Sequence, residues 1–226
     1  MRRTTFAALL LMTVAPALAQ TRPAEKTPIS GEFTMRPTGV IDLGDVYIEV
    51  NYYDAKWVIA QQHDRFAPTT APMITASQMT IPGILTTPAG PAKYTQSITA
   101  QPDGLNLSAE FVSDKPLDTN ELSMTFILPV ATFGGREMKI DGVAQPLPLT
   151  PATKGMPRIF DKDAVREIEV PTPQGTLVVS GQFKLLLNDD REWNDPRYSL
   201  RLYFTPGSGA ITRSAVDLKL RLKKTP

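Results

Sequence analysis

The chain has 226 residues, of which 42% are hydrophobic, with 24 basic side chains, 23 acidic side chains and no cysteine. This balance excludes the basic surface that nucleic acid or an anionic membrane would attract. The lack of cysteine excludes disulfides, thiolate metal sites, cysteine nucleophiles and a lipid anchor on cysteine, so the fold must be held by a hydrophobic core, which a chain of this length can bury.

Residues 1–19 have the pattern of a signal peptide. Met-Arg-Arg is followed by a short apolar run that ends in Ala17-Leu18-Ala19, before Gln20. The run is too short to span a membrane, although a buried N-terminal helix would share its composition. Cleavage would leave 22 basic and 23 acidic side chains, a net charge of −1. We therefore expect an exported bacterial protein, periplasmic or secreted, with a flexible leader over residues 20–30.

Beyond the leader, apolar and polar residues alternate in the manner of half-buried strands. The clearest runs are VYIEVNY (46–52), LNLSAEF (105–111), SLRLYF (199–204) and VDLKLRL (216–222). Further strands are predicted over 56–62, 73–81, 93–101, 121–129, 137–142, 167–171 and 176–187.

Turn residues separate these runs. Most of the 21 prolines lie between apolar runs, where they suit turns and edge strands. Asp141-Gly142 predicts a hairpin turn. The best helical candidate is the short segment 160–168. About ten to twelve strands with few helices predict an all-β fold, a large two-sheet antiparallel β-sandwich forming a single domain over residues 31–226.

Few residues could support catalysis by a histidine or a cofactor. His63, beside Asp64, is the one imidazole of the chain, and no G-x-S-x-G motif supplies a serine nucleophile for it. A lone histidine after a strand is more typical of a loop. Sites with several histidine ligands are excluded, and phosphate-binding and dinucleotide motifs are missing. We expect no cofactor and no bound metal.

The segment 187–204 concentrates charged and aromatic residues, and its first half allows several interpretations. Its carboxylates could hydrolyse glycosides as an acid and base pair, or bind calcium, although the spacing does not match a D-x-D-x-D-G loop. A charged connection between strands is a simpler interpretation. In it, Asp190–Arg191 and Asp195–Arg197 ion pairs would hold the turn, and Trp193 would cover the edge of the core.

Carbohydrate contact is a further interpretation of the same segment. Aromatic faces stack on sugar rings, while carboxylates and guanidinium groups bond their hydroxyls. The candidate ligand-binding residues on this segment are Asp189, Asp190, Arg191, Trp193 and Tyr198. Trp57, near Tyr52 and Tyr53, belongs to a second aromatic group, although aromatic residues in strands are usually part of the core.

The stretch 120–222 resembles a known family. Asp189-x-Arg191-x-Trp193 followed by Ser199-Leu200-Arg201-Leu202 is similar to the D-x-R-x-W segment and S-L-R-L strand of galactose-mutarotase-like "supersandwich" domains, which precede catalytic domains in some bacterial glycoside hydrolases. The resemblance implies an accessory domain that supports or presents substrate to a polysaccharide-degrading enzyme. This sequence stops at Pro226 without a catalytic domain, and no catalytic residue is implied.

Three functional hypotheses follow. The first is an exported, non-catalytic β-sandwich that binds carbohydrate, with a polysaccharide or a separately encoded glycan-active enzyme as partner. The second is a polysaccharide-active enzyme, either a hydrolase using carboxylates or a lyase. The third is a structural or interaction module that binds another protein through a sheet edge or face.

Overall fold

The structure, a computed structural model, describes residues 27–151, 154–205 and 207–224. The predicted signal peptide (1–19) and the first part of the predicted leader (20–26) lie outside the described residues. No helix within the described ranges is long and apolar enough to cross a membrane.

The described chain is almost entirely β-structure, which confirms the predicted all-β class. Its strands are β1 (Thr27–Ser30), β2 (Phe33–Met35), β3 (Ile41–Leu43), β4 (Val46–Asp54), β5 (Ile59–Gln61), β6 (Phe66–Pro68), β7 (Met73–Ile74), β8 (Gln78–Thr87), β9 (Gly90–Gln101), β10 (Gly104–Pro129), β11 (Glu137–Ile140), β12 (Val143–Pro146), β13 (Arg158–Thr172), β14 (Gly175–Asp189), β15 (Arg197–Tyr203) and β16 (Gly209–Lys223). Single helical turns are α1 (Gln62–Arg65), α2 (Val130–Phe133) and the 3₁₀ turn η1 (Asp190–Trp193).

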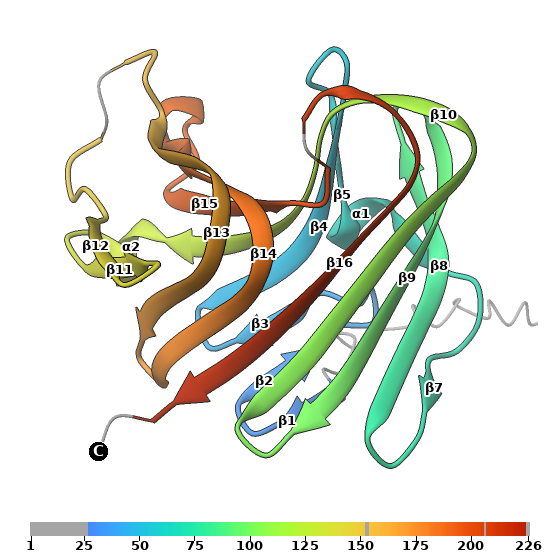
Figure 1. The fold of residues 1–226 in the computed structure, drawn as a ribbon, viewed down its shortest axis with the longest axis horizontal. Helices are drawn as coiled ribbons and strands as arrows, with labels where there is room; N and C mark the ends of the chain where they lie inside the picture. Colours follow the sequence, from blue (N-terminus) through green and yellow to red (C-terminus); the bar gives the residue numbers. More distant parts are fainter. Residues whose placement is uncertain (1–26, 152–153, 206, 225–226) are drawn as a thin grey trace, which may run out of the picture.

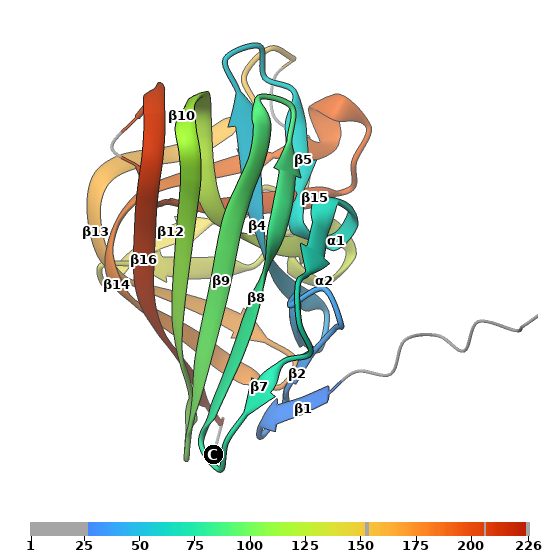
Figure 2. The ribbon, with the colours of Figure 1, turned by 90° about the vertical axis from the view of Figure 1, so that its right-hand side faces the viewer.

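The strands form two packed antiparallel layers, which are joined because long strands pass from one layer to the other (Figure 1). Residues 104–112 of β10 pair with β9 and β16, whereas residues 119–127 pair with β4 and residues 123–129 with β15. β14 likewise pairs first with β16 and then with β15. We call the layer of β8, β9 and β16 the first sheet and the layer of β4 and β15 the second sheet. Figure 2 views the first sheet, with β16, β10, β9 and β8 side by side.

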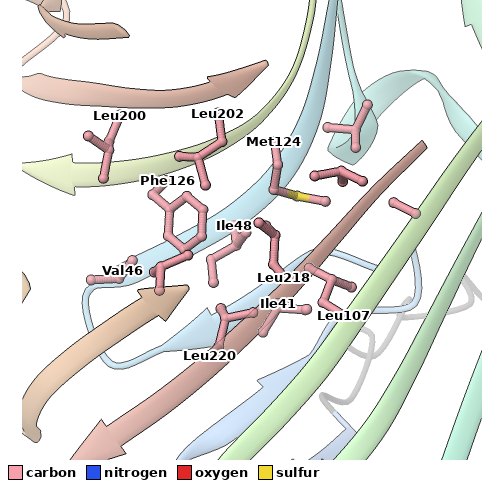
Figure 3. Close-up of a cluster of buried hydrophobic side chains, with 14 of the residues drawn as sticks. Ile41, Val46, Ile48, Leu107, Met124, Phe126, Leu200, Leu202, Leu218 and Leu220 are labelled. Carbon is pink, nitrogen blue, oxygen red and sulfur yellow. The ribbon is translucent and has the colours of Figure 1, made fainter. Parts of the chain in front are cut away.

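The core lies between the two sheets. Apolar side chains of β4, β10 and β15, such as Ile48, Phe126 and Leu200, meet Leu107 and Leu218 from the first sheet (Figure 3). These residues are almost completely buried. The alternation that predicted the inward faces of 46–52, 105–111, 199–204 and 216–222 is therefore confirmed, and burial of this apolar surface is the main stabilising contribution.

The hairpin predicted at Asp141-Gly142 is confirmed between β11 and β12. Both turn residues have positive φ angles, 49° at Asp141 and 78° at Gly142. Two successive left-handed residues are the requirement of a type I′ turn, whose twist matches that of the flanking strands.

Two local predictions are wrong. Residues 160–168, expected as a short helix, belong to strand β13, because their backbone pairs with β14, for example Lys162 with Leu185. Residues 27–30, expected as part of a flexible leader, form β1, which pairs with β2, and the hydroxyl of Ser30 donates to the carbonyl of Gln101 at 2.7 Å. In both segments the secondary structure depends on pairing with residues distant in the sequence, which local composition does not predict.

Candidate functional site

The second sheet carries an unusual outer face. Side chains that alternate with the core residues point away from the core, and such positions are ordinarily polar and wet. Here many of them are polar but buried, including Glu49 on β4, Glu121 on β10 and Arg201 on β15. Burying charged groups is costly unless they are paired, so this face must contain compensating partners.

A cleft of about 900 Å³ lies over this face. Three segments supply its walls: the turn between β4 and β5, residues 155–158, and η1 with the residues that follow it. Both ribbon views place these three segments at the same end of the molecule, at the top (Figures 1 and 2). The lining residues are Tyr53, Trp57, Ile59, Gly155, Met156, Pro157, Arg158, Leu186, Asn188, Asp190, Trp193, Asp195, Arg197 and Arg201.

Arg201 and Glu121 form the buried centre of the floor. Arg201 Nη1 lies 3.2 Å from Glu121 Oε2, which also accepts a hydrogen bond from the hydroxyl of Tyr203 at 3.0 Å. Glu121 Oε1 accepts from Ser123 Oγ at 2.6 Å. Burial, followed by the Glu121 charge, raises the pKa of Tyr203, so the hydroxyl remains a donor.

Asp190 is a buried carboxylate that lines the cleft. It accepts from Ser199 Oγ at 2.9 Å and lies 3.4 Å from Arg197 Nε and 3.7 Å from Arg201 Nη2. Burial raises the pKa of Asp190, and this effect outweighs the opposing attraction of the two arginines. The group is thus a carboxylate whose ionisation is disfavoured although cations surround it.

Among the described residues, one acceptor of the floor has no hydrogen-bond partner. Asn188 is nearly buried and lines the cleft, yet its Oδ1 has no hydrogen-bond partner among the described residues. Buried polar atoms are nearly always hydrogen-bonded, so this acceptor is an exception in the floor, although the oxygen itself is not exposed to the cleft.

The rim of the cleft is apolar and exposed. Trp57, Met156 and Trp193 come from three different segments, and their exposed fractions are 60%, 68% and 57%. Trp57 packs edge-on against Tyr53 at 5.8 Å between ring centroids, and the guanidinium of Arg201 lies 5.1 Å from the Tyr53 ring. Exposed apolar residues that gather at one cleft are typical of a binding site.

Trp57 also has a strained backbone. Its φ is +62°, a left-handed conformation that is rare for bulky residues and is usually taken by glycine. The turn is held by the Asp54 carboxylate, which accepts from the backbone N–H groups of Lys56 and Val58, both at 2.8 Å. The fold thus keeps a large exposed ring where a glycine would be more stable, which favours a functional role for the ring.

This strain is testable by comparing Trp57→Gly with Trp57→Ala. Both variants lose the ring, but only glycine relaxes the backbone, so Trp57→Gly should be more stable than Trp57→Ala by about 1 kcal/mol. Urea denaturation measures the difference. Equal stabilities would contradict the left-handed conformation of residue 57.

Three of the residues expected to bind ligand make structural contacts within the protein. Asp189 accepts from Nε and Nη2 of Arg191, at 2.8 Å and 2.7 Å. The Arg191 guanidinium also donates to the carbonyls of Pro148 and Leu149, and the buried Tyr198 hydroxyl donates to the Pro148 carbonyl at 2.6 Å. Asp189, Arg191 and Tyr198 therefore act as a clamp that holds the segment leading into the cleft wall.

The structure thus divides the six predicted site residues. Trp57, Asp190 and Trp193 line the cleft, while Asp189 and Arg191 line a neighbouring hollow of about 350 Å³ that also reaches Trp193. The predicted Asp195–Arg197 ion pair is confirmed at 2.9 Å. The predicted Asp190–Arg191 pair is wrong, because Arg191 turns to Asp189 and Asp190 faces Arg197 and Arg201.

Sequence reasoning missed other lining residues: Asn188, Met156, Arg158 and Arg201. Arg201 was identifiable in part, because it lies on the polar face of a strand whose leucines point to the core. Met156 gave no signal, since it lies in a segment without periodicity.

His63 lies apart from the residues that line the cleft. Its Nδ1 is 2.7 Å from Oε2 of the fully buried Glu49, which also accepts from the backbone N–H of His63 at 3.2 Å. No group of three or more histidine, aspartate or glutamate side chains in the described ranges is arranged to hold a metal ion.

Comparison with known proteins gives a likeness of fold only. No protein-family model and no curated protein matches the chain. Among solved structures, the chain is similar to an Escherichia coli K12 protein provisionally named an aldose 1-epimerase, with a TM-score of 0.47 and 9% sequence identity over 88% of this chain and 98% of that chain. The resemblance to accessory domains of glycoside hydrolases stays a prediction.

Proposed function

We propose that this protein is an exported, non-catalytic β-sandwich that binds carbohydrate in the cleft over its second sheet. The observation that carries the proposal is the pair of exposed tryptophans, Trp57 and Trp193, on separate walls of one cleft with a polar floor. The C–H faces of sugar rings pack against such rings, and their hydroxyls need donors and acceptors close by.

The floor supplies those donors and acceptors. Asp190 presents acceptors, and the guanidinium group of Arg197 presents donors. The clamp formed by Asp189, Arg191 and Tyr198 holds one wall in place, which reduces the cost of ordering it when a ligand binds. Export rests on the pattern of residues 1–19, and a separately encoded glycan-active enzyme is the partner that an accessory role would require.

Affinity electrophoresis with a panel of polysaccharides tests the proposal. At least one polymer should retard the protein, and Trp193→Ala and Trp57→Gly should each weaken binding about ten-fold or more, because each removes a stacking surface. Ile74→Ala is the matched control, since Ile74 on β7 is also an exposed apolar residue, at 63%, and β7 lies at the opposite end of the molecule from the turn between β4 and β5 (Figure 2). Equal losses in all three variants would argue against the cleft.

A glycoside hydrolase is the second candidate, and one observation favours it. Asp190 has a raised pKa and shares the cleft with Asp195, and a general acid with a second carboxylate is the requirement of glycoside hydrolysis. The test is whether the wild type releases reducing ends from a polysaccharide. If it does, and a folded Asp190→Asn variant does not, the hydrolase becomes the first candidate. The partial neutralisation of both carboxylates by Arg197 favours binding over catalysis.

A further inference from the structure

We propose that the glycan which the cleft takes is uncharged. The inference rests on the proposed carbohydrate function and concerns the class of ligand that the same site accepts. It is carried by the charges of the floor and walls, because each cationic side chain that lines the cleft is already engaged by a carboxylate.

Each of the three arginines that line the cleft has a carboxylate partner. Arg158 Nη1 lies 2.9 Å from Asp161 Oδ2, and Arg197 Nε lies 2.9 Å from Asp195 Oδ2 and 3.4 Å from Asp190 Oδ2. Arg201 lies 3.2 Å from the fully buried Glu121 and 3.7 Å from Asp190. The three lining arginines are thus paired with four carboxylates, of which Asp190 and Asp195 line the cleft, and Asp161 is shared with Lys184 at 3.7 Å.

An acidic glycan would meet unfavourable electrostatics in this cleft. Its carboxylate or sulfate would have to draw Arg201 or Arg197 away from Glu121 or Asp190, which would leave a buried negative charge without its partner. The remaining carboxylates would also repel the ligand. Acidic polysaccharides are ordinarily bound by arginines and lysines that have no carboxylate partner. Among the described residues that line this cleft, every arginine has such a partner, and there is no lysine.

A cationic glycan is also disfavoured. The four carboxylates are held by arginines, and Asp190 has a pKa that burial raises. An amino group would therefore compete for these carboxylates with guanidinium groups that are already in place. Hydroxyls require no such exchange, since they can accept from guanidinium N–H groups that line the cleft while the ion pairs stay intact.

Matched polymers that differ in charge provide the test. We suggest affinity electrophoresis against hydroxyethylcellulose and carboxymethylcellulose, dextran and dextran sulfate, and glycol chitin and glycol chitosan. In the pair that binds, the neutral polymer should bind more tightly than its charged partner. The affinity for the neutral polymer should change less than about two-fold between about 0.01 M and about 1 M NaCl. The Debye length falls from about 30 Å to about 3 Å over this range, so binding that depends on charge would weaken.

The outcomes separate the two proposals. Tighter binding of a charged polymer that weakens with salt would overturn the inference and leave the carbohydrate proposal in place. Retardation by no polymer, in this set or the wider panel, would overturn the carbohydrate proposal itself.

A gain-of-function variant tests the charge argument directly. Asp195 is partly exposed, so Asp195→Asn should fold normally while it releases Arg197 from one of its carboxylates. We expect this variant to bind carboxymethylcellulose or dextran sulfate at least about three-fold more tightly than the wild type at low salt, and to lose the gain at high salt.

Asp103→Asn is the matched control. It makes the same change in charge and breaks the same kind of arginine pair, with Arg221 at 3.5 Å, in the turn between β9 and β10 at the opposite end of the molecule (Figure 1). No gain is expected there. An equal gain in both variants would show a general effect of net charge and overturn the inference.

Discussion

Replacing Arg201 with methionine is expected to lower the free energy of unfolding by about 3–5 kcal/mol. The Arg201 side chain is 8% exposed and its partner Glu121 is fully buried. Methionine fills much of the same volume but carries no charge, so Glu121 would keep only the hydroxyls of Ser123 and Tyr203 as donors. A buried carboxylate without its cation is among the most costly changes that a single substitution makes. Urea denaturation with a two-state fit measures the loss.

Two further variants show whether burial of the charge is the cause. Adding Glu121→Gln to Arg201→Met should recover a large part of the lost stability, because the unpaired charge is removed. Arg213→Met breaks an ion pair with Glu110 in which the arginine is 75% exposed, and should cost less than about 1 kcal/mol. Similar losses in Arg201→Met and Arg213→Met would contradict the buried network.

The second large expected effect is a loss of stability at alkaline pH. All six tyrosines have raised pKa values, with burial as the largest cause in each case: Tyr47, Tyr52, Tyr53, Tyr94, Tyr198 and Tyr203. The pKa of Tyr53, at the cleft, rises to about 12. A tyrosine in the unfolded chain titrates near about 10, so between pH 10 and 12 the folded state holds more protons than the unfolded state.

Because the folded state holds more protons, the free energy of unfolding falls as the pH rises. Stability that depends on neutral tyrosines is fully present below about pH 10 and is lost as the pH rises through the folded pKa values. Tyr53 alone contributes on the order of 3 kcal/mol of this loss. Since the total stability of a domain is about 5–15 kcal/mol, the protein should unfold cooperatively between about pH 10 and 12.

Near-ultraviolet absorbance measures tyrosinate directly. Little tyrosinate should form before unfolding, and the absorbance change should coincide with loss of β-structure by circular dichroism. In Tyr53→Phe, the free energy of unfolding should fall less steeply with pH in the same range, by about 1.4 kcal/mol per unit. Gradual tyrosinate formation near pH 10 in a folded protein would contradict the buried environments.

The fold was predictable to the extent that it depends on local alternation. The runs at 46–52 and 216–222 report which side chains face the core, because period two is a property of the extended chain itself. Their pairing is not local. Segments 105–111 and 121–129 were expected as separate strands, yet they are two parts of β10, which continues through the charged stretch between them and changes neighbours from β9 to β4.

The candidate site was predictable only in its exposed part. Trp57 and Trp193 attract notice because large rings beside polar residues have few structural uses on a surface. Asp189 and Asp190 are adjacent, and composition gives no means of telling which of them pairs with Arg191. Which carboxylate pairs with Arg191 depends on where the guanidinium group lies. The backbone carbonyls of residues 148–150, about forty residues away in the sequence, accept hydrogen bonds from it. Arg201 on β15 and Asn188 on β14 likewise meet at the cleft only because the fold pairs their strands.

The long strands that pass between the layers have a consequence for how the domain comes apart. Because β10 and β14 each belong to both sheets, the backbone hydrogen bonds of one layer cannot be released without disturbing strands that also hold the other. Partial opening is therefore confined to peripheral elements such as β7 and β12, which pair on one side only. The floor of the cleft, which is built on β10, β14 and β15, lies in the part of the chain that persists until the whole domain unfolds.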